Sequence, residues 1–112
     1  VWGTGNPLRE FLHVEDLASS VEFLLDKNLE IDLLNVGSGY EISIKELANM
    51  IKDIVVFKGD VLFDKTKPDG NPRKLLDSGK INSLGWTPTI TLEEGLSKTY
   101  NWFVSNYSSI RI

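Results

Sequence analysis

The chain has 112 residues, a net charge of -4, no cysteine and one histidine. It is long enough for one modest core. The lack of cysteine excludes disulfide frameworks and cysteine nucleophiles, and with a single histidine it also excludes the usual zinc sites. The acidic balance argues against phosphate-driven nucleic-acid binding. No apolar run approaches the roughly 20 residues of a membrane span, and no signal peptide is visible. We therefore expect neither a nucleic-acid nor a membrane partner.

Turn residues begin the chain, and predicted strands and a helix follow. Two glycines and Pro7 predict a turn over residues 1–9. Residues 10–14 are typical of a short strand or extended segment. Apolar residues at helical spacing then predict a helix over 14–27. The short apolar run 33–37 is followed by glycine and predicts a buried strand.

Two capping boxes mark later helix starts. Ser-Ile-Lys-Glu at 43–46 and Thr-Leu-Glu-Glu at 91–94 each pair an N-cap hydroxyl with a glutamate three residues on. They predict helices that run to about residues 55 and 106. We expect core positions at Trp86 and Trp102, and along the apolar stripe of the last helix, namely Leu92, Leu96, Tyr100 and Phe103.

The middle of the chain predicts shorter elements. Residues 60–64 favour a strand, and 65–74 favour a loop because they hold two prolines and a glycine. A short helix is predicted over 78–84, with Asp77 as its cap. The order indicates a small mixed α/β fold in a single domain over 1–112. It has too few strand–helix alternations for a full doubly wound nucleotide-binding domain.

Residues 3–5, Gly-Thr-Gly, are similar to the opening of a dinucleotide fingerprint. The third glycine is missing, no strand precedes it and no helix follows at once, so the match is weak. A turn that lets Trp2 and Arg9 face a common space is favoured instead. His13 has no partner that the sequence places beside it, and we interpret it as structural. Asp16 is most simply a helix-start residue.

Arg9 and the 65–74 loop are the candidates for binding an anion. An arginine offers a rigid fork of donors that suits phosphate oxygens, although Arg9 could equally be a surface residue paired with Glu10 or Glu15. The loop holds four cations against one anion, and a local excess of this sign attracts phosphorylated ligands. The alternative is an ordinary solvated loop. The residues show no complete catalytic set and no metal cluster.

Several segments resemble the start and body of the C-terminal half of the GDP-L-fucose synthase family, which belongs to the extended short-chain dehydrogenases/reductases. Arg-Glu-Phe-Leu-His-Val at 9–14 alone would indicate only that larger group. Lys-Pro-Asp-Gly-Asn-Pro-Arg-Lys-Leu-Leu-Asp at 67–77 is the specific part. The resemblance covers nearly the whole chain, through residues 1–5, 7–16, 35–39, 63–77, 84–86 and 99–103.

The resemblance implies a substrate-binding C-terminal part of an enzyme that epimerises GDP-4-keto-6-deoxy-mannose and reduces it with NADPH to GDP-L-fucose. The family's Rossmann domain and its catalytic residues come upstream of Val1. We therefore expect a fragment that is inactive alone and lacks catalytic residues. NADP(H) is expected only in the full-length enzyme, bound by the missing N-terminal domain.

By the same resemblance, Trp2, Arg9 and Asp69 match family positions that contact the GDP-sugar. Lys67 falls where a related epimerase places a phosphate-binding arginine, which is a looser match. A carboxylate at Asp69 suits ribose hydroxyls or the guanine N–H edge. The alternative for Asp69 is a plain ion pair with Lys65, Lys67 or Arg73.

The expected partners are the GDP-sugar and the protein's own N-terminal Rossmann domain. We expect a homodimer for the full-length protein, a monomer for the fragment, and a cytoplasmic location. The fragment should be marginally stable and expose an apolar face where the other domain packs. The alternative function is a free-standing protein-interaction domain with a degenerate sugar-nucleotide pocket.

Overall fold

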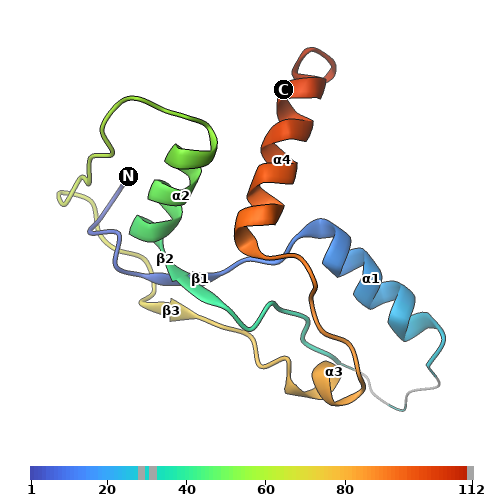
Figure 1. The fold of residues 1–112 in the computed structure, drawn as a ribbon. Coiled ribbons are helices and arrows are strands. Elements are labelled where there is room, and N and C mark those ends of the chain that lie inside the picture. Colours follow the sequence, from blue (N-terminus) through green and yellow to red (C-terminus); the bar gives the residue numbers. More distant parts are fainter. Residues whose placement is uncertain (28–29, 31–32, 111–112) are drawn as a thin grey trace.

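A computed structural model describes residues 1–27, 30 and 33–110. Its centre is a small sheet of three strands in the order β2-β1-β3, formed by β1 (Leu8–Glu10), β2 (Glu41–Ser43) and β3 (Arg73–Lys74) (Figure 1). β1 pairs antiparallel with β2 and parallel with β3. The register sets Arg9 between Ile42 and Lys74, so these three side chains share one face of the sheet.

The longer helices are α1 (Val14–Leu25), α2 (Ile44–Ile54) and α4 (Leu92–Asn106), with a short α3 (Gly79–Ser83) and a final 3-10 turn, η1 (Tyr107–Ser109). Both capping boxes are confirmed, because each N-cap hydroxyl accepts from the backbone N–H of its glutamate. α2 packs against α4, while α1 starts at the base of α4 on its other side and runs away from it (Figure 1). No helix in the described part of the chain is both long and apolar enough to cross a membrane.

The core is small and partly polar. Its buried apolar side chains are Ile42, Ile81 and Trp86, and the prediction for Trp86 is confirmed. Asp16 is also buried, at 2 % exposure, and it does more than start a helix. Its carboxylate accepts from Thr89 N, Thr89 Oγ1 and Ile90 N at 3.0–3.1 Å, which ties α1 to the segment before α4.

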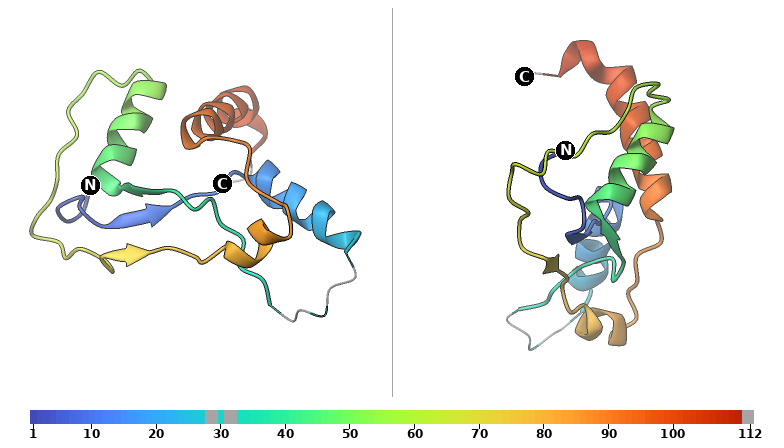
Figure 2. Two further views of the ribbon diagram at one scale, coloured as in Figure 1. Left: turned by 60° about the horizontal axis from the view of Figure 1, so that its bottom comes forward. Right: turned by 90° about the vertical axis from the view of Figure 1, so that its left-hand side faces the viewer.

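The arrangement is open, and Figure 2 shows helices standing away from the sheet. The radius of gyration is 16.9 Å, whereas a compact domain of this length has about 13 Å. The accessible surface is 8419 Å², about a third above the roughly 6,200 Å² of a compact protein of this mass. Many large apolar side chains are exposed. α1 exposes a stripe at helical spacing, and we call it the α1 apolar face: Val14, Leu17, Val21 and Leu25.

Two predicted strands are wrong. Residues 33–37 form no strand, and Leu33 is 77 % exposed. Residues 60–64 form no strand either, apart from a single parallel bridge between Asp64 and Trp2. The apolar pattern was present in both runs. A strand also needs hydrogen-bonded neighbours along its length. Among the described residues, 33–37 has no row of them, and 60–64 has them only at its end, where Leu62 O, Asp64 N and Asp64 O bond residues 1–3.

The bounds of other elements differ from the predicted ones. The first strand begins two residues before the predicted 10–14 segment, inside the predicted turn, and the predicted loop 65–74 ends in β3. Asp77 accepts from Gly79 N at 2.9 Å as expected of a cap, although the N-cap position of α3 is Ser78. The core predictions for Trp102 and Phe103 are wrong: they are 61 % and 43 % exposed, on the end of α4 that projects from the body (Figure 1).

Candidate functional site

The first residues of the chain run beside the 62–74 segment, and we call this contact the seam. Gly3 N donates to Asp64 O at 2.9 Å and Asp64 N donates to Val1 O at 2.8 Å. Further along, Leu8 N donates to Pro72 O at 2.9 Å, next to the pairing of β1 with β3. Segments that are about 60 residues apart in sequence are thus joined, and all four predicted site residues lie on them.

Trp2 and Lys67 meet at one end of the seam. The Lys67 ammonium lies 5.6 Å from the centroid of the Trp2 ring, within range of a cation–π contact. Trp2 is 76 % exposed, so the ring has a face open to solvent. An exposed aromatic ring beside a cation suits a ligand that combines a planar base with phosphates.

Arg9 is held in place by the seam. Its Nη1 donates to Leu8 O at 2.6 Å and to Asn71 O at 2.8 Å. A side chain on Gly70 would come within 3.1 Å of Nη2, so this glycine allows the loop to lie against the guanidinium. Neither Nε nor Nη2 has a hydrogen-bond partner among the described residues. Two donors of a fixed fork are therefore available to an anion.

The surface-pair alternative for Arg9 is wrong in this structure. The Glu10 carboxylate accepts from Gly39 N at 2.7 Å and from Leu76 N at 3.0 Å. Glu15 forms its ion pair with Lys98 on α4. Both acids are engaged elsewhere, so the Arg9 charge is left for another partner.

Asp69 faces the predicted Gly-Thr-Gly turn. Its Oδ1 accepts from Thr4 N and its Oδ2 from Thr4 Oγ1, both at 2.7 Å. The hydrogen bond from the Thr4 hydroxyl, followed by that from the Thr4 amide, holds the pKa of Asp69 below its usual value. The ion pair with a loop cation that we considered for Asp69 is not formed. The ion pairs of the described residues are Arg73–Glu41 and Lys98–Glu15.

Arg73, one of the four loop cations, is already bound to a carboxylate. The Arg73 guanidinium donates to both carboxylate oxygens of Glu41 at 2.6–2.9 Å, so it joins the two outer strands across β1. Lys74, the next residue, points to the opposite face, because strand side chains alternate. There it lies in register beside Arg9, and the two form a pair of cations on one face.

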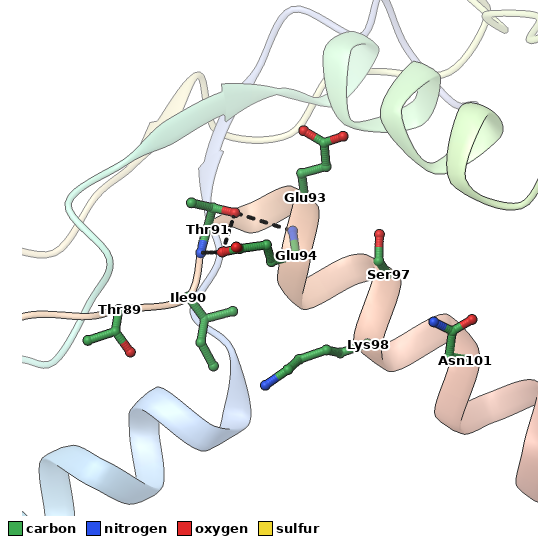
Figure 3. Close-up of a pocket in the computed structure, with 8 residues that line it drawn as sticks. All are labelled: Thr89, Ile90, Thr91, Glu93, Glu94, Ser97, Lys98 and Asn101. Atoms are coloured by element: carbon green, nitrogen blue, oxygen red, sulfur yellow. Dashed lines mark hydrogen bonds between the residues drawn. The ribbon is translucent and has the colours of Figure 1, made fainter.

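A hollow in the surface lies away from the seam. A hollow of about 650 Å³ runs along the first turns of α4 and contains none of the four predicted residues (Figure 3). Its Thr91 and Glu94 are committed to the capping box, and its Lys98 to Glu15. These groups stabilise α4, and other polar side chains of the hollow, Glu93, Ser97 and Asn101, form no hydrogen bond with one another.

His13 is structural, as predicted. Its Nδ1 accepts from Glu15 N at 3.2 Å and so caps α1. Its ring lies against Gly95, where an added Cβ would approach to 3.0 Å.

Sequence reasoning missed two partners in the seam, namely Thr4 with Asp69 and Lys74 with Arg9. Only the loop chemistry around Thr4 was a signal, since a hydroxyl between two glycines is typical of a side chain that bonds a nearby group. Nothing in the sequence places residue 4 beside residue 69.

Comparison with known proteins bears on the family and the fold. The NAD dependent epimerase/dehydratase family profile matches residues 1–37. The chain is 58% identical to a putative GDP-L-fucose synthase 2 of Arabidopsis thaliana, over 95% of this chain and 32% of that protein. It is 45% identical to the GDP-L-fucose synthase of Escherichia coli K12, over 99% of this chain and 37% of that one.

A solved structure gives the same result for the fold. The GDP-L-fucose synthetase of Naegleria fowleri, bound to NADP, superposes with a TM-score of 0.91 at 30% identity and covers all of this chain and 36% of its own. The resemblance seen in the sequence is confirmed. The small mixed α/β fold is part of the epimerase fold, and the chain spans about a third of the length of the relatives it matches.

Proposed function

We propose that this chain is the substrate-binding part of a GDP-L-fucose synthase, an NADP-dependent enzyme that epimerises and reduces a GDP-linked keto sugar. The observation that carries the proposal is the seam. It gathers an exposed aromatic ring, a fixed guanidinium with free donors, a lysine and an oriented carboxylate on two segments far apart in sequence. We further propose that the protein acts in the cytoplasm.

Each seam residue has a role that follows from its chemistry. Arg9 offers Nε and Nη2 to a phosphate, and Lys74 supplies a second cation on the same face of the sheet. Lys67 adds charge near Trp2, whose open ring face can stack on the guanine. Asp69 has about four lone-pair sites and uses two of them for Thr4. The others can accept from the ribose hydroxyls.

In the described part of the chain, the turn that is similar to a dinucleotide fingerprint does not fit NADP(H). The Gly-Thr-Gly turn has no room for a pyrophosphate, because Asp69 fills the space beside Gly3 and Phe63 the space beside Gly5. A Cβ on either glycine would come within 2.1 Å and 2.5 Å of these side chains, respectively. We place cofactor binding and catalysis in a separate Rossmann domain. The 112-residue chain mixed with NADPH and the keto sugar should therefore show no loss of NADPH absorbance.

We propose that the α1 apolar face contacts this Rossmann domain. Its four side chains are 47–79 % exposed, and the surplus surface of the chain is larger than the roughly 600–1,500 Å² that an interdomain contact buries. The match to the epimerase family covers residues 1–37, which include all of α1. In the assembled enzyme we propose a homodimer, whereas the 112-residue chain alone should be monomeric.

Calorimetric titration of the 112-residue chain with GDP tests the proposed site. We expect saturable binding that Arg9→Ala weakens by about 1.5–3 kcal/mol, or roughly 10- to 100-fold, since a charge-assisted contact is lost. Arg73→Ala is the matched control, because it removes the same charge from the same sheet but from a guanidinium already bound to Glu41. No binding of GDP, or equal effects of the two variants, would contradict the proposal.

A further inference from the structure

The Gly-Thr-Gly turn has a contact that the proposed function does not use. The Thr4 hydroxyl donates to Asp69 Oδ2 at 2.7 Å, and the Thr4 amide donates to Oδ1 at 2.7 Å. The same hydroxyl accepts from Asn6 N at 3.2 Å, which fixes its orientation. One residue of the turn thus binds both oxygens of a carboxylate in the loop opposite.

The flanking glycine makes this contact possible. Gly3 has a φ of +81°, and a Cβ at this position would lie 2.1 Å from Asp69 Oδ1. A side chain here would be strained and would also displace the Asp69 carboxylate. The absence of a Cβ therefore serves the close approach of Asp69 rather than the approach of a dinucleotide.

We infer that Thr4 is a positioning residue. The hydrogen bond from its hydroxyl to Asp69, which we call the latch, holds the 65–71 loop against the first residues of the chain and so sets the affinity of the seam for a GDP-sugar. This inference rests on the proposed function. Lys67, Asp69 and the Asn71 carbonyl that anchors Arg9 all belong to this loop. Two loop contacts lie on either side of the latch: Lys67 over Trp2, and the Asn71 carbonyl on Arg9.

The latch acts by preorganisation. A loop held in its binding geometry loses less conformational freedom when the ligand arrives. The bond that Thr4 donates also fixes which lone pairs of Asp69 remain free, because each carboxylate oxygen has one site taken. Without the hydroxyl, Asp69 keeps only the amide bond and can rotate away from the position that suits the ribose.

The test compares three substitutions in the 112-residue chain by calorimetric titration with GDP. Thr4→Val keeps the shape and the amide but loses the hydroxyl, and it should weaken binding about tenfold. Thr4→Ser keeps the hydroxyl and should bind within about threefold of the original chain. Thr99→Val is the control, because it removes a hydroxyl that bonds only Gly95 O in its own helix, and it should change nothing.

A double substitution tests whether Thr4 acts through Asp69. If it does, Thr4→Val combined with Asp69→Asn binds no more weakly than Asp69→Asn alone, since residues that act as one unit are not additive. Amide exchange measured by NMR gives a readout without ligand. Thr4→Val should speed exchange at Leu8, whose N–H donates to Pro72 O beyond the loop, by at least about fivefold, and Thr4→Ser should not.

The outcomes separate the two proposals. Equal GDP binding by the original chain and Thr4→Val overturns the latch, and so does failure of Thr4→Ser to restore binding. If the original chain binds no GDP, the proposed function fails, and the exchange at Leu8 then decides on the latch alone. If Thr4→Val does not fold, normal GDP affinity and normal exchange in Thr4→Ser support the latch, and a Thr4→Ser chain that binds as weakly as Asp69→Asn overturns it.

Discussion

Replacing Asp16 by asparagine should destabilise the fold more than the same substitution at any other aspartate that the structure describes. The buried carboxylate accepts three hydrogen bonds from Thr89 and Ile90. An asparagine keeps one acceptor oxygen and turns an NH₂ group toward at least one of these donors. A buried donor left without an acceptor costs about 1–3 kcal/mol, and bonds to a charged group are at the upper end.

We expect Asp16→Asn to lower the free energy of unfolding by about 3 kcal/mol, the upper end of this range, because the lost bond was made to a buried charged group. This is a large share of the 5–15 kcal/mol that stabilises a typical domain, and it corresponds to a drop of roughly 10–20 °C in Tm. Urea denaturation followed by far-UV circular dichroism at pH 7 measures it. Asp53→Asn is the control, since Asp53 is exposed on α2 and its substitution should change stability by less than about 0.5 kcal/mol.

The effect should also depend on pH. Burial raises the pKa of Asp16, but the hydrogen bonds from Thr89 and Ile90 outweigh burial and hold it below the usual value. A depressed pKa means that the carboxylate stabilises the fold above its unfolded-state pKa of about 3.9 and that this contribution is lost as the pH falls through the folded-state pKa. The difference between the original chain and Asp16→Asn should shrink below about pH 4. Equal stability at pH 7, or a difference that does not shrink in acid, would refute this reading of the carboxylate.

Three further predictions concern the seam and the exposed face. Asp69→Asn should weaken GDP binding about tenfold and remove the preference for GDP over its 2′,3′-dideoxy analogue; a retained preference would point to the guanine as the partner, and unchanged affinity to a loop residue only. Arg9→Lys should recover only part of the affinity lost in Arg9→Ala, because lysine lacks the planar fork; full recovery would mean that charge alone matters. The chain should bind a hydrophobic dye, and the double variant Leu17→Ser/Val21→Ser should bind less of it. Equal dye binding by the variant would mean that the dye binds elsewhere than on the α1 apolar face.

Local chemistry predicted the helices of this fold well. The capping boxes at Ser43 and Thr91 are complete within four residues, and the structure confirms them. The strands were harder, because pairing is not local. β1 begins inside what reads as a turn, and the apolar run 33–37 has no row of hydrogen-bonded neighbours among the described residues. Trp102 has the pattern of a core residue, but a pattern cannot say whether the chain supplies the surface that covers it.

For the candidate site too, the residues could be predicted but not the partners that they contact. Arg9 and the 65–74 loop were identified from their chemistry, and Lys67 and Asp69 within that loop from the resemblance. The structure brings these residues to one seam. The partners of these residues could not be predicted, since they depend on residues 60 or more positions apart. The alternative for Arg9, a surface ion pair with Glu10, is excluded by the structure, in which Glu10 accepts from two backbone amides.

Mapping GDP onto the chain by NMR tests the central claim most directly, because it reports where the ligand binds as well as whether it binds. A ¹⁵N-labelled 112-residue chain would be titrated with GDP while backbone and Trp2 indole signals are followed. The seam predicts saturable shifts at Trp2, Arg9, Lys67 and Asp69, with little change at Ser97 and Asn101 in the hollow beside α4. Saturable shifts confined to that hollow, or none at all at millimolar GDP, would contradict the claim.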